Sequence, residues 1–325
     1  MFLEPIAPLK TMEPKAVNDY DFSTIGGNGG NVRLLIEGME HSGGFSAPKF
    51  ATAARMLESM FKPSDGKVRW LSFPACLMAT GTRSFFVELL RREMIDVIVT
   101  TCGTIDHDIA RSIGEYGSGS FEIDDHEAYA NGFSRLGNVL VPIETYGPAI
   151  ESFLTPLFQE TIDVLDAQSR TIAPAELIWK IGSTLDDDNS LCTWADRKKI
   201  PVIVPGIVDG AVGAQIHLHS QNRATWVDPM ADQHRLSDIV WNASTSEAFM
   251  IGGGISKHHV IWWNQYRSGL DKAVYITTAV EYDGSLSGAR LREAISWGKL
   301  KSTAEEIVVE GEASLLLPLL GAYLF

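Results

Sequence analysis

Short apolar runs alternate with stretches of helical periodicity along most of the chain. Six runs rich in β-branched residues have the length of buried strands, at 68–73, 97–101, 139–141, 201–204, 248–251 and 273–278. Apolar residues recur every three or four positions, as in amphipathic helices, at 31–39, 48–61, 83–94, 150–165, 174–181, 234–245 and 256–266. The alternation predicts an α/β fold: a Rossmann-like, doubly wound, mostly parallel sheet with helices on both faces.

The same pattern divides the chain into two unequal parts. Residues 1–45 are expected to form an N-terminal extension with a first helix, and residues 1–30 are rich in Pro and Gly, ending in GGNGG. Residues 46–325 are long enough for one large α/β catalytic domain.

Composition narrows the classes of partner. Lys and Arg number 27 against 41 Asp and Glu, which gives a net charge of −14. An acidic surface repels phosphate backbones, so we expect no nucleic-acid binding, whereas polyamines or basic protein loops suit it. Three cysteines without a close pair indicate a reducing compartment. No apolar run reaches about 18 residues and no signal peptide is visible, so we expect a cytoplasmic protein with no membrane span.

Small and polar segments follow the predicted strands, where doubly wound sheets bind their ligands. These segments are 74–82, 100–108, 205–211, 252–259 and 277–289. Glycines 252–254 precede a helix, with Ser256 as its expected N-cap, and such a turn can face an anion. Asp209 next to Gly210 resembles the acidic residues that bind ribose hydroxyls, although an Asp-Gly turn is an equally ordinary explanation.

The segment 100–108 allows three interpretations. Cys102 is a candidate nucleophile near His107. Asp106, His107 and Asp108 are candidate metal ligands, although three consecutive residues at a helix start cannot all converge on one ion. In the interpretation that we favour, small residues line a cofactor while Asp106 faces a cation. His217 and His219 alternate as on one strand face, yet no third ligand accompanies them, so we expect packed histidines and no metal.

Lys299 and His258 are the candidates for covalent and proton-transfer chemistry. A helix carrying Glu293 is expected to end at Gly298, so that Lys299 projects from its end. A lysine beside Trp297 can be desolvated, which lowers its pKa and frees the amine for imine formation. A surface lysine at a helix end is the plainer explanation. His258 lies near a helix start, which favours the neutral imidazole of a general base, whereas His259 is expected to pack.

Several motifs in order resemble one known family. The segment 273–299, AVYITTAVEYDGSLSGARLREAISWGK, is accompanied upstream by NDYDFST (18–24), VTTCGTIDHD (99–108), RLGNVLVP (135–142), PGIVDGAVG (205–213) and IGGGISKHH (251–259). Together they resemble the deoxyhypusine synthase family, in the form of its archaeal members.

The resemblance implies an NAD-dependent transferase. Such an enzyme moves the aminobutyl group of spermidine, or of a related polyamine, onto a lysine of the translation initiation factor 5A precursor. The group passes through an imine on Lys299, with His258 as general base. Residues 46–325 would then bind NAD, and the protein would be a homotetramer built as a dimer of dimers.

The resemblance also assigns the remaining site residues. The polyamine contacts carried over are Glu293, Trp297, Asp106 and Ser287. The positions on the cofactor side are Ala79, Thr80, Thr101, Gly103, Asp209, Gly253, Thr277, Thr278 and Asp283.

Three positions depart from eukaryotic members of the family. Leu286 and Ala214 stand where those enzymes have acidic residues, and His107 replaces a glutamate. Fewer carboxylates leave the donor open, and an aminopropyl-agmatine-like polyamine is one alternative. Homospermidine-type transfer to a small amine and a catalytically silent NAD-binding protein are further alternatives. A metal hydrolase would use Asp106, His107, His217 and His219.

Overall fold

The computed structural model describes residues 31–221 and 224–325. The glycine-rich loop expected before residue 31 and the segment at 18–24 lie outside these residues. Within the described part of the chain, no helix has the length and apolar character needed to cross a bilayer.

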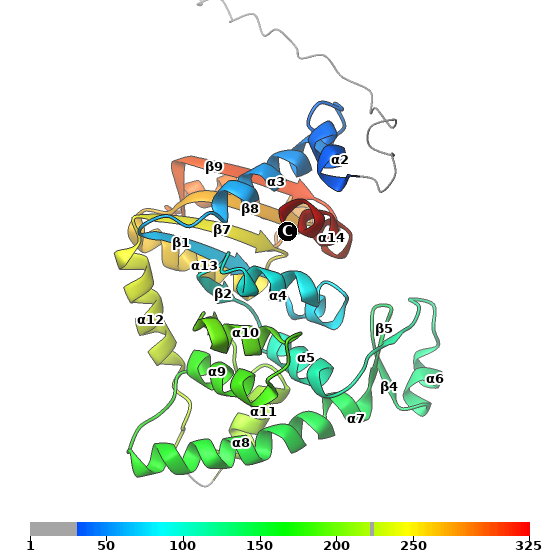
Figure 1. Cartoon of the computed structure of the whole chain (residues 1–325), viewed down its shortest axis with the longest axis vertical. Helices are drawn as coiled ribbons and strands as arrows, with labels where there is room; N and C mark the ends of the chain where they lie inside the picture. Colours follow the sequence, from blue (N-terminus) through cyan, green and yellow to red (C-terminus); the bar gives the residue numbers. More distant parts are fainter. Residues whose placement is uncertain (1–30, 222–223) are drawn as a thin grey trace, which may run out of the picture.

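The main sheet has six parallel strands (Figure 1). They are β1 (Lys67–Ser72), β2 (Val97–Val99), β6 (Val202–Ile203), β7 (Thr245–Ile251), β8 (Leu270–Thr277) and β9 (Leu300–Glu310), in the order β6-β2-β1-β7-β8-β9. The chain builds outward from β1 on one side and then returns to place β7 on the other. The reversal puts a topological switch point between β1 and β7, where such sheets bind ligands at the carboxyl ends of their strands.

Helices cover both faces of this sheet, as predicted. The α-helices are α2 (Val32–Met39), α3 (Ala47–Met60), α4 (Arg83–Arg91), α5 (Cys102–Ile113), α6 (Asp125–Ala130), α7 (Ile143–Tyr146), α8 (Pro148–Ala167), α9 (Pro174–Leu185), α10 (Leu191–Lys198), α11 (Ala211–Leu218), α12 (Pro229–Asn242), α13 (Gly254–Asn264) and α14 (Ala313–Leu324). Short 3-10 helices are η1 (Ala75–Ala79), η2 (Gln265–Arg267), η3 (Glu281–Asp283) and η4 (Leu291–Ile295).

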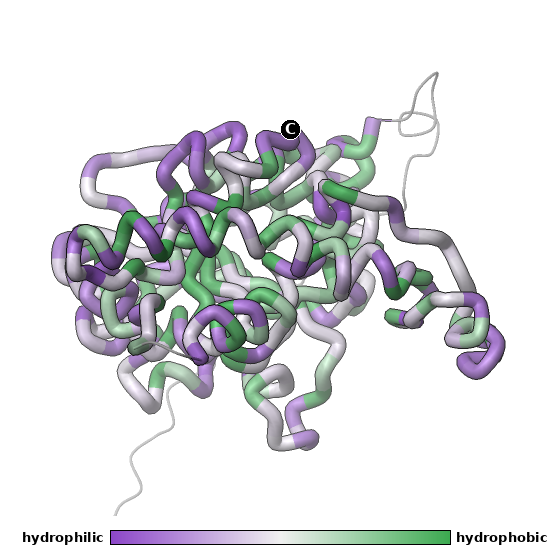
Figure 2. The backbone as a smooth tube through the Cα atoms, turned by 90° about the horizontal axis from the view of Figure 1, so that it is seen from below, coloured by the Kyte–Doolittle hydropathy of each residue, from purple (hydrophilic) through white to green (hydrophobic). Residues whose placement is uncertain are grey.

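Neighbouring residues of each strand belong to different cores. Leu71 packs in the larger core with α2, α3, α4, α5 and α14, whereas Trp70 packs in the smaller one with α12, α13 and η4. Because successive side chains of a strand point to opposite faces, both faces of β1 are buried. The hydropathy colouring agrees, since hydrophobic stretches concentrate in the middle of the molecule (Figure 2).

One predicted strand belongs to a different sheet. The run at 139–141 lies in β5 (Val139–Pro142), which pairs antiparallel with β3 (Gly117–Ser118) and β4 (Phe133–Leu136). This small sheet and α6 project from the body of the molecule (Figure 1). Our placement of 139–141 in the main sheet was therefore wrong. The sequence does contain a local sign of the antiparallel pairing: Gly137-Asn138 forms the two-residue connection typical of a β-hairpin.

Three other expectations were wrong. His217 and His219 do not alternate on a strand, because Ala211–Leu218 is helix α11 and His219 is its C-cap. Ser256 does not cap α13; Gly253 is the N-cap residue. Strand β9 had no counterpart in the prediction, because this edge strand is interrupted by polar residues and lacks a continuous apolar run.

Candidate active site

The segments that follow the strands converge at the carboxyl ends of the strands of the main sheet. A Cβ atom built on Gly252 would lie 3.4 Å from Pro74, and one built on Gly103 would lie 3.0 Å from Ala75. A Cβ on Gly253 would overlap Ser287. Loops after β1, β2, β7 and β8 thus touch one another, and the absence of side chains at the glycines makes the close approach possible.

Lys299 lies at the border of this region. It follows η4, a short 3-10 helix where we expected an α-helix, and Gly298, whose φ of +66° turns the chain. The Lys299 N–H donates to the Ala294 carbonyl at 3.0 Å, and the residue is only 9% exposed. The glycine therefore folds the lysine back against the protein.

Lys299 is one of the residues that line a small cavity of about 180 Å³. The lining residues of the cavity are Lys257, Ile261, Leu286, Ala289, Arg290, Leu291, Glu293, Ala294, Trp297 and Lys299. The structure thus brings together three of the predicted residues, Lys299, Glu293 and Trp297. Leu286, the first departure from the family pattern, also lies in this wall.

Two tryptophan rings flank the Lys299 amine. Its Nζ lies 5.2 Å from the centre of the Trp297 ring and 5.5 Å from that of Trp262. The Trp262 ring in turn stacks on the His258 imidazole, with centroids 5.6 Å apart and planes 26° apart. His258 therefore lies close to the amine, separated from it by one indole.

Burial and the Lys299 charge both lower the pKa of His258, which favours the neutral imidazole that a general base requires. The neighbouring His259 is different. Burial lowers its pKa to about 4, and its Nε2 has no hydrogen-bond partner among the described residues. His259 contacts Trp263 edge-on, in keeping with the packing role that we expected.

Lys257 is a buried lysine in the same cavity, 2% exposed. Its Nζ donates to the carbonyl oxygens of Leu286 at 2.9 Å and Ala289 at 2.6 Å, and lies 3.8 Å from the centre of the Tyr275 ring. Burial lowers the pKa of this amine to about 7. Lys257 thus ties α13 to the segment that forms the cavity wall.

Asp106 and Ser287, unlike the predicted polyamine contacts Glu293 and Trp297, are not part of the lining of the Lys299 cavity. Asp106 is fully buried. Its carboxylate accepts the N–H groups of Ala211 and Val212 at 2.8 and 2.9 Å and the Tyr146 hydroxyl at 2.9 Å. The Asp106 carboxylate therefore holds the start of α11, and both of its oxygens accept hydrogen bonds from protein groups.

The cofactor-side residues lie on the converging loops. Thr101 and Gly253 are the N-cap residues of α5 and α13, and neither helix start has a side-chain cap. The Thr277 hydroxyl donates to the Ser287 carbonyl at 3.0 Å, while Asp283 and Asp209 are exposed. Of the remaining members of this set, Ala79 and Thr80 end the 3-10 helix η1 after β1, Gly103 lies in the first turn of α5 after β2, and Thr278 directly follows β8.

The alternative chemistries of α5 lack the geometry that they need. Burial raises the pKa of the Cys102 thiol to about 12, so it carries almost no thiolate at neutral pH. Its sulfur faces Asp106, whereas the His107 ring bonds the Tyr116 hydroxyl. Among the described residues, no three His, Cys, Asp or Glu side chains gather closely enough to hold a metal ion.

Sequence reasoning did not single out Lys257 or Trp262. Lys257 lies inside the motif GISKHH, directly before the two histidines. Trp262 follows His258 by four residues, the spacing that places two side chains on one helix face. That spacing was the available signal.

Comparison with known proteins identifies the family of the chain. The family model "Deoxyhypusine synthase" matches residues 34–324. A protein of Ignicoccus hospitalis described as "Probable deoxyhypusine synthase" is 48% identical over 298 residues, covering 90% of this chain and 91% of its own. A Picrophilus torridus protein of the same description is 45% identical over 292 residues, covering 90% and 92%.

The fold has a solved counterpart. The crystal structure of a candidate deoxyhypusine synthase from Entamoeba histolytica superposes with a TM-score of 0.62 at 23% identity, covering 94% of this chain and 96% of that one. At this identity the likeness concerns the fold. The family model and the archaeal relatives carry the assignment, and they show that this chain belongs to the deoxyhypusine synthase family, a family of transferases.

Proposed function

We propose that the protein transfers the aminobutyl group of spermidine, or of a related polyamine, to a lysine of the translation initiation factor 5A precursor, using NAD. The observation that carries the proposal is the setting of Lys299. The residue is nearly buried, its amine lies within 5.5 Å of the centres of two indole rings, and it shares a cavity with Glu293. Within the family, this is the setting expected of an imine-forming lysine.

The loops at the sheet edge fit a dinucleotide. The starts of α5 and α13 lack side-chain caps, so their N–H groups are available to a pyrophosphate. Gly252 and Gly254 have positive φ, and the glycines leave room for a ligand to approach the backbone. Thr101, Gly103, Asp209, Gly253, Thr277, Thr278 and Asp283, with Ala79 and Thr80, are the residues proposed to hold it. Bound NAD supplies hydride removal from the polyamine and hydride return to the product.

The chain's own residues divide the remaining work. Glu293 attracts an ammonium group of the donor, and the exposed Trp297 covers its carbon chain. The Lys299 amine captures the four-carbon unit by forming a carbon–nitrogen double bond. His258, held neutral by its surroundings, takes a proton during the exchange. Ser287 contributes through its carbonyl, which fixes Thr277 and Tyr275.

The wider expectations become proposals as well. We propose that residues 46–325 act as one NAD-binding catalytic domain and that the protein is a cytoplasmic homotetramer. Large apolar side chains exposed near the site support self-association, with Trp297 67% exposed and Tyr282 90% exposed.

One experiment tests the transfer and its acceptor. The protein is incubated with NAD and labelled spermidine, together with either the factor 5A precursor or putrescine. Mass spectrometry then measures a gain of one aminobutyl unit. We expect the gain on a lysine of the protein acceptor. Labelled homospermidine with an unmodified protein acceptor would instead show the small-amine reaction. If neither product forms although NAD and the donor are intact, the proposal is overturned.

A further inference from the structure

Trp262 is a feature of the Lys299 site that the family resemblance did not assign. It projects from α13, one turn after His258, and is 41% exposed. Two aromatic contacts fix its ring: the stacked His258 imidazole and the edge-on Tyr266 ring, whose centroid lies 6.4 Å away. The indole face is therefore held in one orientation.

The Lys299 nitrogen lies within cation–π distance of this face. Its Nζ is 5.5 Å from the Trp262 ring centre and 5.2 Å from the Trp297 ring centre. A cation within about 6 Å of an indole face is attracted by the ring quadrupole. Two indoles on different elements, α13 and the segment after η4, thus lie near one nitrogen atom, and we call them the Trp262–Trp297 box.

The charges of the cavity leave a part for the aromatic rings. Glu293 supplies the carboxylate of the lining, beside the amines of Lys257 and Lys299, and Arg290 is paired with Glu281 and Glu310. Because Glu293 is proposed to bind the ammonium group of the donor, the indole faces are the groups that remain to attract a cation formed at Lys299. Aromatic faces attract a cation while remaining uncharged and weakly hydrated.

We propose that the Trp262–Trp297 box stabilises the covalent iminium on Lys299, with Trp262 as a catalytic residue not previously assigned. This inference rests on the proposed function. The neutral Nζ adds to the carbon of the protonated C=N bond of the four-carbon donor unit and forms a new carbon–nitrogen bond. One proton moves from Nζ to the former donor nitrogen, and that amine then leaves with the electron pair of its carbon–nitrogen bond. The positive charge that the donor imine carried ends on the Lys299 nitrogen, near the two rings, and no oxidant is consumed in this step.

The test measures the covalent species directly. Full-length protein turning over NAD and labelled spermidine without acceptor is quenched with borohydride, and label on Lys299 is measured by peptide mass spectrometry. Trp262→Leu should trap about two- to thirtyfold less adduct than the parent. Trp262→Phe keeps a π face and should recover a large part of it. Trp262→Gln serves as a second ringless variant if Leu disturbs folding.

Trp241→Leu is the matched control, because Trp241 is an exposed tryptophan on α12 outside the cavity. It should trap as much adduct as the parent. Equal trapping in the parent and in a folded ringless Trp262 variant would overturn the inference and leave the proposed function standing. A parent protein that never carries label on Lys299 while consuming donor would overturn both.

Discussion

Lys299 is proposed to react through its amine, and an arginine at this position cannot do so. Lys299→Arg preserves the positive charge and most of the length, yet a guanidinium stays protonated and forms no imine. We expect transfer to the acceptor to fall below detection, while NAD-dependent cleavage of the donor persists in part. Product mass spectrometry and NADH absorbance separate the two. Transfer at more than a few per cent of the parent rate would contradict the role of Lys299.

Lys257 should make stability depend on pH. Burial lowers its pKa from 10.5 to about 7 in the folded protein. Between about pH 7 and pH 10.5 the unfolded chain then binds one more proton at this site than the folded chain does. The free energy of unfolding therefore rises with pH across that window. Urea denaturation at pH 7.5 and 9.5 should show this rise in the parent and a smaller rise in Lys257→Met.

The exposed Lys62 provides the control for that measurement. Lys62→Met should keep the pH dependence of the parent. A Lys257→Met protein with the same pH dependence as the parent would show that the buried amine does not titrate differently on folding.

How much of the site could be predicted depends on how its parts are encoded. Lys299, Glu293 and Trp297 lie within seven residues, so a local motif brings them together. Asp106 was expected to face a cation, because a carboxylate after a strand usually faces the ligand edge. Its partners are the N–H groups of α11, a contact across 105 residues that no local pattern encodes.

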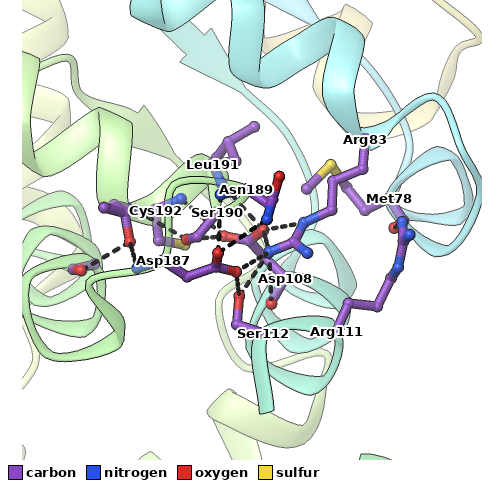
Figure 3. A network of polar contacts seen from close by, with 12 residues as sticks. Met78, Arg83, Asp108, Arg111, Ser112, Asp187, Asn189, Ser190, Leu191 and Cys192 are labelled. Atoms are coloured by element: carbon purple, nitrogen blue, oxygen red, sulfur yellow. Dashed lines mark hydrogen bonds and ion pairs between the residues drawn. The ribbon is translucent and has the colours of Figure 1, made fainter. Parts of the chain in front are cut away.

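At the scale of elements, α4, α5 and α10 are joined by a buried ionic network (Figure 3). Asp108 accepts hydrogen bonds from Arg83 Nε at 2.9 Å, from Ser190 Oγ at 2.7 Å, and from the N–H groups of Leu191 and Cys192. Asp108→Asn should lower the free energy of unfolding by about 3 kcal/mol, because it removes one of the two carboxylates that pair with the buried Arg83 and leaves only Asp187, 3.4 Å away. Chemical denaturation measures the loss.

An exposed pair gives the comparison for Asp108. Asp125 pairs with Arg135 on the projecting unit, and its side chain is well exposed. Asp125→Asn should leave the free energy of unfolding nearly unchanged, because water screens an exposed ion pair. Equal losses in the two variants would mean that the network of α5 contributes no more than a surface ion pair.

Elements were predictable where both faces of a strand are buried. The runs that became β1, β2, β6, β7 and β8 are continuous and apolar because helices cover them on both sides. The edge strand β9 mixes polar and apolar residues, so its sequence lacks that signature. The region of α11 was predicted as a strand because His217 and His219 are two residues apart. Two positions are too few to distinguish the period of a strand from that of a helix.

At the scale of the whole molecule, the net charge of −14 should guide a basic protein acceptor toward the site. Long-range attraction between opposite charges raises the association rate and is screened by salt. We expect kcat/KM for the factor 5A precursor to fall by roughly three- to tenfold between 50 and 300 mM KCl. Donor cleavage without acceptor, which also involves a cation but a small one, provides the internal reference and should fall less. An equal fall in both reactions would mean that salt weakens polyamine binding. The acidic surface would then not contribute to recognition of a protein acceptor.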